Sequence, residues 1–561
     1  MATDGHAAEP LVEHKPRGPN LKNPPLLPED QWPTYPGFNF EILHRDQGDS
    51  DARTGRLTTP HGVVETPAFI FCATKAAIKG LTMEQMKACD TQIVLSNTYH
   101  LHVQPGSEAI RDMGGLQKAT NWRGPMLTDS GGYQIFSMGH GSVSDEIKGR
   151  RGATDANPNP PSLLSIGEKG ARFKSYHDGS IKQLSPETSI QIQRDLGADL
   201  ILVLDECTPF HVDKEYTAAS TRRSHRWALR SLNEFVRTAN EGAQQQALYG
   251  IIQGGVYRDL RAESAAFVNA QPFFGIAVGG SLGASAADMY RVVDMTMAMV
   301  RRDRPVHLLG IGGVADIFNG VSHGIGTFDC VHPTRLGRHG GALVRVRHWP
   351  KSACSLAVQS SPPVHTNPRG IDTFDCVHPT RLGRHGGALV RARHWSRGGG
   401  EGQVPRASIQ LAKGQFRGDA RPVDAECGCP TCAAGYSRAY LHHCVRAGEL
   451  VGGALLTQHN VWTMNALMAD VRAAIAAGTP LEQVEDHWLA PGLRSADIVA
   501  ADAMRRGGAA AAAAGDGGDG SVAATHATGV AAAAGGRSDG GGAGGGSGDA
   551  ADDGSITAAA L

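Results

Sequence analysis

Eight short apolar runs alternate with amphipathic stretches between residues 68 and 331, and this rhythm restricts the fold more than any other feature of the chain. Each run is continuously apolar, which is typical of parallel strands buried on both faces. The expected strands are Ala68–Cys72, Gln92–Ser96, Pro125–Thr128, Leu200–Leu204, Ala247–Ile252, Phe274–Val278, Val306–Leu309 and Thr327–Val331. Eight strand–helix units predict an α/β fold of the (β/α)8 TIM-barrel type, with a doubly wound open sheet as the alternative.

Capping residues predict where several helices begin and end. Thr82 can cap the stretch MEQMKAC, and Ser185 followed by proline opens a helix that Gly197 ends. The longest helical patterns cover 217–238 and 286–302. A strand-rich stretch around Arg56–Glu65 precedes the alternating strands and helices. A hairpin with an Asp178-Gly179 turn interrupts the alternation before Ser185.

The two ends of the 561-residue chain differ in composition from its middle. Residues 1–37 are polar and proline-rich and lack the apolar run of a secretory signal, so a disordered extension is expected. The barrel should span 38–500, and the Ala/Gly-rich tail 501–561 should be disordered. No segment has the roughly 18 consecutive apolar residues of a membrane span. Ten cysteines without a secretory signal favour a reducing compartment and metal or catalytic roles.

One segment occurs twice. Residues 324–349 recur at 370–395, 46 positions further on, and differ only at Gly326/Asp372 and Val346/Ala392. Two copies are too few for a solenoid, so we expect one working segment and one duplicate, at about 350–395. Residues 331–421 hold 15 Lys+Arg against 4 Asp+Glu. That excess is a candidate contact for a phosphate backbone, and a merely solvated basic loop is the alternative.

Polar residues stand where the predicted barrel strands end: Asp129, Asp205, Gln253, the pair Gly279-Gly280, and Asp329. Active sites of this fold lie at the carboxyl ends of the strands. A single aspartate at such a place is more often a helix cap. Three of them, together with a glutamine and two glycines that let a flat ligand approach, favour a functional site.

A metal signature follows the barrel. Cys427, Cys429 and Cys432 are followed 27 residues later by His459. Three thiolates and an imidazole can hold Zn²⁺ tetrahedrally, and four protein ligands leave no open position, so the site should be structural. A zinc subdomain is expected at about 405–460, with His459 opening the next helix, which ends near Gly478. Rival ligands on the intervening helix are His442, His443 and Cys444.

These motifs together identify a family. The chain has DSGGYQ at 129–134, DECTP at 205–209, IIQGG at 251–255, AVGG at 277–280, FDCVHPTR at 328–335, the cysteine motif with His459, and SRAYLHH at 437–443. From about residue 40 to 500 it closely resembles the tRNA-guanine transglycosylases (queuine tRNA-ribosyltransferases). The resemblance covers neither the tails nor the second FDCVHPTR copy.

The resemblance implies exchange of guanine at wobble position 34 of tRNAs with GUN anticodons for queuine or a related 7-deazaguanine. Asp329 would be the nucleophile at ribose C1′, with Asp375 as its duplicate candidate, and Asp129 the general acid/base. The implied purine contacts are Ser130, Gly131, Gly132, Tyr133, Asp205, Cys207, Gln253, Gly279 and Gly280. The implied RNA contacts are Gly310, Ile311, Gly312, Gly313, Val314, Ala315, Asp316, Thr334, Arg335, Leu336, Gly337 and Arg338.

The chemistry agrees with these residue types. Exchange at C1′ with retention requires two displacements and a covalent carboxylate intermediate, as in retaining glycosidases. Two aspartates suffice, and the chain has no Walker-type phosphate loop. The implied partners are tRNA, the free base, one structural Zn²⁺, and a second subunit in a homodimer or in a heterodimer with a non-catalytic paralogue. The implied location is the cytoplasm, with mitochondrial association as an alternative.

Two features leave choices open. Gly283 stands where bacterial relatives carry a bulkier residue, which leaves room for queuine, yet DECTPFHVDKEYT resembles the bacterial form, so the incoming base is undecided. Short strand–helix spacing favours Asp329 as the working copy, whereas GIDTFDC around Asp375 is closer to the family's usual form. Other hypotheses are a catalytically inactive tRNA-binding or scaffold subunit, and a metal hydrolase, which the closed zinc site opposes.

Overall fold

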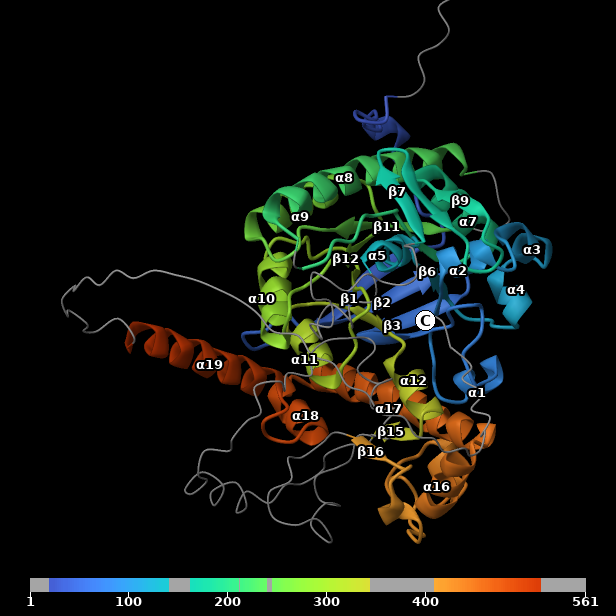
Figure 1. Ribbon diagram of the computed structural model, residues 1–561, viewed down its shortest axis with the longest axis vertical. Helices are drawn as coiled ribbons and strands as arrows, with labels where there is room; N and C mark the ends of the chain where they lie inside the picture. Colours follow the sequence, from blue (N-terminus) through green and yellow to red (C-terminus); the bar gives the residue numbers. More distant parts are fainter. Residues whose placement is uncertain (1–19, 141–161, 211, 240–244, 344–407, 516–561) are drawn as a thin grey trace, which may run out of the picture. The chain divides into compact units, whose positions relative to one another are not determined.

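The computed structural model describes residues 20–140, 162–210, 212–239, 245–343 and 408–515 (Figure 1). The chain divides into two compact units, residues 1–505 and 506–561, and the features below lie in the first unless stated. Its centre is a closed barrel of eight parallel strands. The strands are β4 (Ala68–Cys72), β5 (Val94–Ser96), β6 (Met126–Thr128), β10 (Leu200–Leu202), β11 (Ala247–Ile252), β12 (Gly275–Val278), β13 (Val306–Leu308) and β14 (Thr327–Cys330).

Every predicted barrel strand is therefore present, with ends that shift by at most two residues. The last strand pairs with the first, Thr327 opposite Ala68 and Cys330 opposite Phe71, which closes the sheet and excludes the open alternative. Side chains such as Phe69, Phe71 and Phe328 are buried, as continuous apolar runs require.

Helices follow the strands. They are α1 (Met83–Lys87), α2 (Thr98–Val103), α3 (Ser107–Asp112), α4 (Leu116–Thr120), α5 (Gly132–His140), α7 (Pro186–Leu196), α8 (Lys214–Arg237), α9 (Arg258–Ala270), α10 (Ala286–Met297), α11 (Val314–Ser322) and α12 (His332–Arg338). The predicted caps are confirmed: Thr82 forms a capping box, and Ser185 accepts a hydrogen bond from the Thr188 N–H. Gly197 ends α7 with φ +71°. Helix α10 stops five residues short of its predicted end.

Two antiparallel sheets flank the barrel. The first, β1 (Asn39–Arg45), β2 (Arg53–Thr59) and β3 (Gly62–Thr66), is the predicted strand-rich lead-in. The second, β7 (Leu163–Gly167), β8 (Gly170–Lys174) and β9 (Ile181–Leu184), contains the predicted hairpin.

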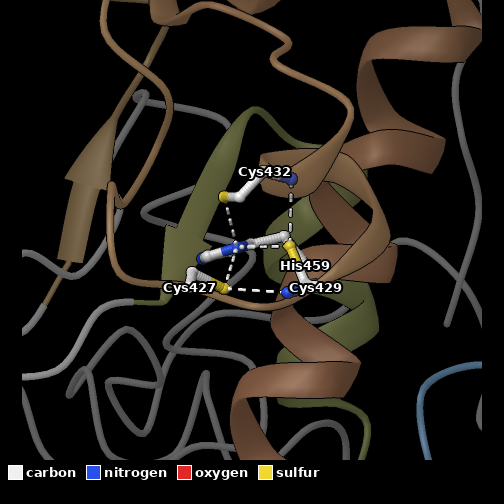
Figure 2. Close-up of side chains that lie close together, drawn as sticks. All are labelled: Cys427, Cys429, Cys432 and His459. Atoms are coloured by element: carbon white, nitrogen blue, oxygen red, sulfur yellow. Dashed lines mark hydrogen bonds between the residues drawn. The ribbon is translucent and has the colours of Figure 1, made fainter.

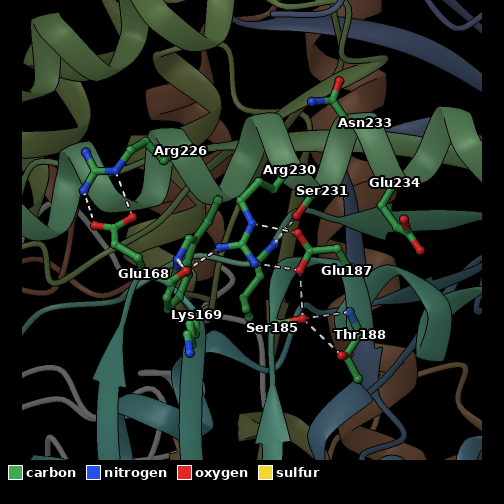
Figure 3. A network of polar contacts seen from close by, with 12 residues as sticks. Glu168, Lys169, Ser185, Glu187, Thr188, Arg226, Arg230, Ser231, Asn233 and Glu234 are labelled. Carbon is green, nitrogen blue, oxygen red and sulfur yellow. Dashed lines mark hydrogen bonds and ion pairs between the residues drawn. The ribbon is translucent and has the colours of Figure 1, made fainter. Parts of the chain in front are cut away.

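Ion pairs attach this second sheet to α8 (Figure 3). Arg226 of α8 makes a two-point contact with Glu168 in the β7–β8 turn, its Nε lying 2.9 Å from Oε2. Arg230, one turn further along, makes a two-point contact with Glu187 of α7 at 2.7 Å for both bonds, and also donates to the Glu168 carbonyl. Paired Arg–carboxylate bonds of this kind fix orientation as well as distance.

The part after the barrel holds β15 (Gly341–Leu343), β16 (Ser408–Gln410), α15 (Pro430–Ala433), α16 (Arg438–Ala447), α17 (Leu450–Ala477), α18 (Leu481–Trp488) and α19 (Ser495–Gly515). Leu343 and Ser408 face each other in the antiparallel β15–β16 pair. The prediction that His459 opens a helix is wrong, because α17 begins nine residues earlier, at Leu450. Gly478 does end it, with φ +66°.

The structure describes part of each predicted end segment. Residues 20–37 of the expected N-terminal extension lie against the barrel, where the Tyr35 hydroxyl donates to the Pro272 carbonyl at 2.8 Å. Helix α19 runs to Gly515, because alanine-rich sequence favours a helix even without apolar periodicity. The strand that closes the barrel, β14, comes from the first copy, and the duplicate copy at 370–395, with Asp375, lies outside the described residues. Among the described residues, no helix is both long and apolar enough to cross a membrane.

Candidate active site and metal centre

Five strands carry the predicted site residues at their ends. Asp129 directly follows β6, Gln253 follows β11 and Gly279 follows β12. Asp205 lies three residues beyond β10, and Asp329 is the third residue of the four-residue strand β14. Because all eight strands are parallel, these ends meet on one face of the barrel, where enzymes of this fold hold their active sites.

Both oxygens of the Asp129 carboxylate accept hydrogen bonds. The Thr98 N–H donates to Oδ1 at 2.8 Å, and the Asn97 side-chain amide donates to Oδ2. Burial raises the pKa of Asp129 to about 7; the Thr98 hydrogen bond opposes the shift, and the charges of Asp329 and Asp205 add to it. A carboxyl group with such a pKa can both give and take a proton at neutral pH. Asn97 and Thr98 were not predicted, although they too directly follow a strand, β5.

Asp205 joins three strand ends. Its Oδ1 accepts from the Ser130 hydroxyl at 3.0 Å, and its Oδ2 accepts from the Gln253 side-chain amide at 2.6 Å. Burial raises the pKa of Asp205 to about 6, and these two hydrogen bonds hold it lower than burial alone would. The other amide atom, Gln253 Oε1, is buried and accepts no hydrogen bond from any residue that the structure describes.

Glycines line this cluster because side chains would not fit. A Cβ atom on Gly132 would overlap the Asp205 carboxylate, and one on Gly280 would overlap Gln253 Oε1. Gly280 also has φ +82°, a conformation that favours glycine. Two other predicted contacts differ in exposure. Tyr133, at the start of α5, has 40% of its surface exposed. The Cys207 thiol has a pKa that burial raises. Cys207 is therefore protonated and suited to contact rather than to nucleophilic attack.

Asp329 is held mainly through one oxygen. Its Oδ1 accepts the Gly310 N–H at 2.7 Å and lies 3.2 Å from Nε2 of His307. Its Oδ2 lies 3.7 Å from the Cys72 sulfur. His307 and Cys72 were not predicted. Cys72 ends β4, and His307 is a polar residue inside an apolar barrel strand, which is the signal that could have revealed it.

A buried arginine that was not predicted supports the loops that hold the predicted purine contacts. Arg261 of α9 is fully buried, and its guanidinium donates to the carbonyls of Gly255 at 2.8 Å and Gly279 at 2.9 Å. Burial lowers its pKa to about 10. This side chain ties the loops after β11 and β12 together, so Gln253 and Gly280 are placed by a common support.

The two predicted RNA-contacting segments lie beside this site. The loop from Gly310 to Asp316 follows β13, and Asp316 accepts bonds from the Gly313 N–H at 3.2 Å and the Tyr290 hydroxyl at 3.0 Å. Asp316 thus caps α11 and attaches it to α10. Of the other predicted contacts, Ile311 and Gly312 lie in the loop, and Val314 and Ala315 begin α11.

The second segment, α12, has one face against α17. Thr334, Leu336 and Gly337 are buried, and the Thr457 hydroxyl of α17 donates to the Thr334 carbonyl at 3.1 Å. Arg335 and Arg338 are only half-buried. Burial and the neighbouring Arg335 lower the pKa of Arg338 to about 10, and burial and both arginines lower that of Lys79. The charges of Lys79, Arg335 and Arg338 therefore influence one another.

The predicted metal ligands converge (Figure 2). Nδ1 of His459 lies 3.5, 3.3 and 3.4 Å from the sulfur atoms of Cys427, Cys429 and Cys432, and all four side chains are buried. Ligand atoms of a tetrahedral zinc site are about 3.5 Å apart, given zinc–ligand bonds of about 2.0–2.3 Å. The residues fit a metal, and they are the one such group in the described part of the chain.

Contacts around the cluster determine which nitrogen of His459 faces the sulfur atoms. They also link the cluster to the segment that follows the barrel. Nε2 of His459 donates to the Leu343 carbonyl, which directs Nδ1 toward the sulfur atoms. The next residue, Asn460, donates to the carbonyls of Pro333 at 3.1 Å and Gly341 at 2.8 Å. The rival His442 instead bonds the Leu411 carbonyl. Helix α17 thus connects the cluster to the segment just after Asp329.

A closed parallel barrel with carboxylates at its carboxyl-end face defines an enzyme of the TIM-barrel class. The family model for queuine tRNA-ribosyltransferase matches residues 47–357 and 364–490. Queuine tRNA-ribosyltransferases of Roseiflexus sp. (strain RS-1) and Synechococcus elongatus are 42% and 35% identical to the chain over 459 and 455 residues. The alignments cover 80% and 81% of this chain, and 98% and 95% of those proteins. The chain belongs to the queuine tRNA-ribosyltransferase family, and it is a pentosyltransferase of tRNA modification.

Proposed function

We propose that this enzyme exchanges guanine at position 34 of tRNAs with GUN anticodons for queuine or a related 7-deazaguanine, through a covalent ribosyl-aspartate. The observation that carries the proposal is the placement of two differently held carboxylates, Asp129 and Asp329, at the catalytic face of a barrel from this family. An inactive tRNA-binding subunit would not need both.

Each carboxylate has its own role in the two displacements. Asp329 attacks C1′ of the ribose as the bond to guanine breaks, and Asp129 gives the departing purine its proton. The incoming base then returns a proton to Asp129 and displaces Asp329 from C1′. A pKa of about 7 lets Asp129 serve in both directions.

Base recognition falls to the Asp205 cluster. Leaving a buried acceptor unpaired costs about 1–3 kcal/mol, so the free Oε1 of Gln253 favours a ligand with an N–H donor, such as a purine edge. Asp205 offers carboxylate oxygens beside it, the Gly280 backbone approaches closely, and Tyr133 stacks on the base. Ser130, Gly131, Gly132, Cys207 and Gly279 complete the proposed contacts.

Gly283 is relevant to the size of the incoming base that the site can accept. It has φ +113°, and a Cβ atom there would overlap the Asp288 side chain, so the turn itself requires glycine. We assign it the further effect of leaving room for the cyclopentenediol of queuine.

The Cys3His cluster is proposed to hold one structural Zn²⁺. Its four ligands close the coordination sphere, so the metal contributes folding free energy and leaves catalysis to the aspartates. We further propose a cytoplasmic enzyme that acts as a homodimer or with a non-catalytic paralogue.

The proposed function is tested with tRNA that carries labelled guanine at position 34. On incubation with queuine, the wild-type enzyme should release the label, and mass spectrometry of the nucleosides should find the new base at that position. Parallel reactions with smaller 7-deazaguanines identify the preferred base. Retention of the label with every base would refute base exchange and favour the inactive-subunit alternative.

A second prediction concerns pH. Just below a pH of about 7, Asp129 is protonated and can donate to departing guanine, so the single-turnover rate of adduct formation should be constant in that range. Above that pH the rate should fall as the carboxyl group ionises. Asp129→Asn should lower the rate about 10²–10⁴-fold and abolish the pH dependence. A wild-type profile that stays flat to pH 9 would contradict the role of Asp129.

A third prediction concerns RNA contact. An Arg335→Ala, Arg338→Ala double variant should weaken tRNA binding and reduce the slope of log K against log salt by roughly 0.7–0.9 for each phosphate that the variant no longer neutralises. The duplicate offers a matched control, Arg381→Ala with Arg384→Ala, which should leave the slope unchanged. An unaltered slope in the Arg335→Ala, Arg338→Ala variant would show that α12 does not contact tRNA phosphates.

A further inference from the structure

His307 occupies an unusual place in the barrel. Its side chain is fully buried in β13, a strand that is otherwise apolar. It pairs with Thr327 on the neighbouring strand β14, and its Nδ1 lies 3.0 Å from the Thr327 hydroxyl. Its Nε2 lies 3.2 Å from Asp329 Oδ1, but the geometry is not that of a hydrogen bond, and Nε2 makes no hydrogen bond to any residue that the structure describes. One imidazole thus bridges two residues of β14.

The hydrogen positions follow from these neighbours. A lone pair on Nε2 would face a carboxylate oxygen and repel it, so Nε2 carries the proton. The Thr327 hydroxyl lies 3.0 Å from Nδ1 and 3.5 Å from the Val306 carbonyl. When it donates to Nδ1, the shorter of the two contacts, this bond selects the Nε2–H tautomer. The Nε2–Asp329 approach is close but not well aligned, and such bonds commonly tighten when substrate binds.

The two oxygens of Asp329 are therefore unlike each other. Oδ1 receives the Gly310 N–H at 2.7 Å and faces the His307 N–H. Oδ2 has the weak thiol donor Cys72 at 3.7 Å. An oxygen that accepts one N–H group and has a second close by is the poorer nucleophile, and the other oxygen keeps its lone pairs for attack.

We propose that His307 is a positioning residue for Asp329, which together with the Gly310 N–H fixes Oδ1 and makes Oδ2 the attacking atom. This inference rests on the proposed function. The bond from Oδ2 to C1′ forms as the C1′–guanine bond breaks, with the guanine taking its electron pair and a proton from Asp129. Oδ1 becomes the ester carbonyl oxygen, keeps the Gly310 N–H bond and can accept the His307 N–H. When the new base attacks C1′, the electron pair returns to Oδ2.

The test compares His307→Leu, which keeps apolar volume without a donor, with His307→Gln, whose amide can donate to Oδ1. Single-turnover adduct formation should fall about 10²–10³-fold in the leucine variant, the usual cost of removing one preorganised donor. The KM for tRNA should not change, and the glutamine variant should be at least tenfold faster than the leucine variant. A structural role alone would lower Tm without this recovery.

Thr327→Val provides an independent variant for the case that His307→Leu does not fold. It removes the hydroxyl that selects the tautomer, so adduct formation should slow while Tm stays near that of the wild type. A folded His307→Leu, or Thr327→Val, that forms adduct at the wild-type rate would overturn the inference and leave the proposed function standing. A wild-type enzyme that forms no adduct would overturn both.

Discussion

Asp329→Asn is expected to abolish the covalent adduct between enzyme and tRNA, whereas Asp375→Asn should leave it at the wild-type level. The first copy of the repeat supplies β14, which closes the barrel between β13 and β4, and its carboxylate is held by the Gly310 N–H. Loss of a covalent nucleophile should lower the rate of base exchange by at least about a thousandfold.

The duplicate makes Asp375→Asn a closely matched control, because the same tripeptide Phe-Asp-Cys surrounds both aspartates. The measurement is a denaturing gel of enzyme mixed with tRNA, together with the release of labelled guanine. Loss of adduct in Asp375→Asn alone would mean that the second copy carries the nucleophile. Loss in both would mean that the duplicate also contributes to the site.

Cys429→Ser is expected to remove the metal and to lower the melting temperature by at least about 5 °C, because apparent binding free energies of structural zinc are about 10–16 kcal/mol in small domains. Cys429 is fully buried, and its sulfur lies 3.3 Å from His459 Nδ1. The variant should also weaken tRNA binding, since Asn460 anchors the Pro333 carbonyl at the start of α12.

Cys444→Ser is the matched control for the metal. Cys444 is also buried and lies on α16, but it is not part of the ligand cluster. Elemental analysis should find about one zinc per chain in this variant and none in Cys429→Ser. A Cys429→Ser protein without metal but with unchanged melting temperature would refute the structural role.

The barrel could be predicted because its signals are local. Continuous apolar runs mark strands buried on both faces, and Thr82, Ser185 and Gly197 act on their own helix ends. The start of α17 could not be predicted, since Gly452 and Gly453 disfavour a helix in isolation. In the fold, a Cβ on Gly452 would meet the Cys444 side chain at 2.7 Å, and one on Gly453 would meet the Arg338 backbone at 3.1 Å. Close packing of α17 on α16 and α12 therefore overrides propensity.

The residues of the candidate site also fall into two groups, those that local sequence predicts and those that only tertiary contacts bring together. Asp129, Asp205 and Gln253 follow apolar runs and are visible in the sequence. Asn97 lies 32 residues from Asp129 in sequence and contacts it because β5 and β6 are neighbours. His307 and Arg261 reach their partners across strands or from a helix, and no spacing rule indicates those contacts.

The β15–β16 pair has a consequence for how this gene can change over evolutionary time. The chain leaves the pair at Leu343 and re-enters it at Ser408, and these two residues stand opposite each other. Sequence inserted or deleted between them leaves both strand ends in place, and the entropy cost of closing a longer loop grows only with the logarithm of its length. Added sequence at this position is therefore compatible with the same pairing of β15 and β16.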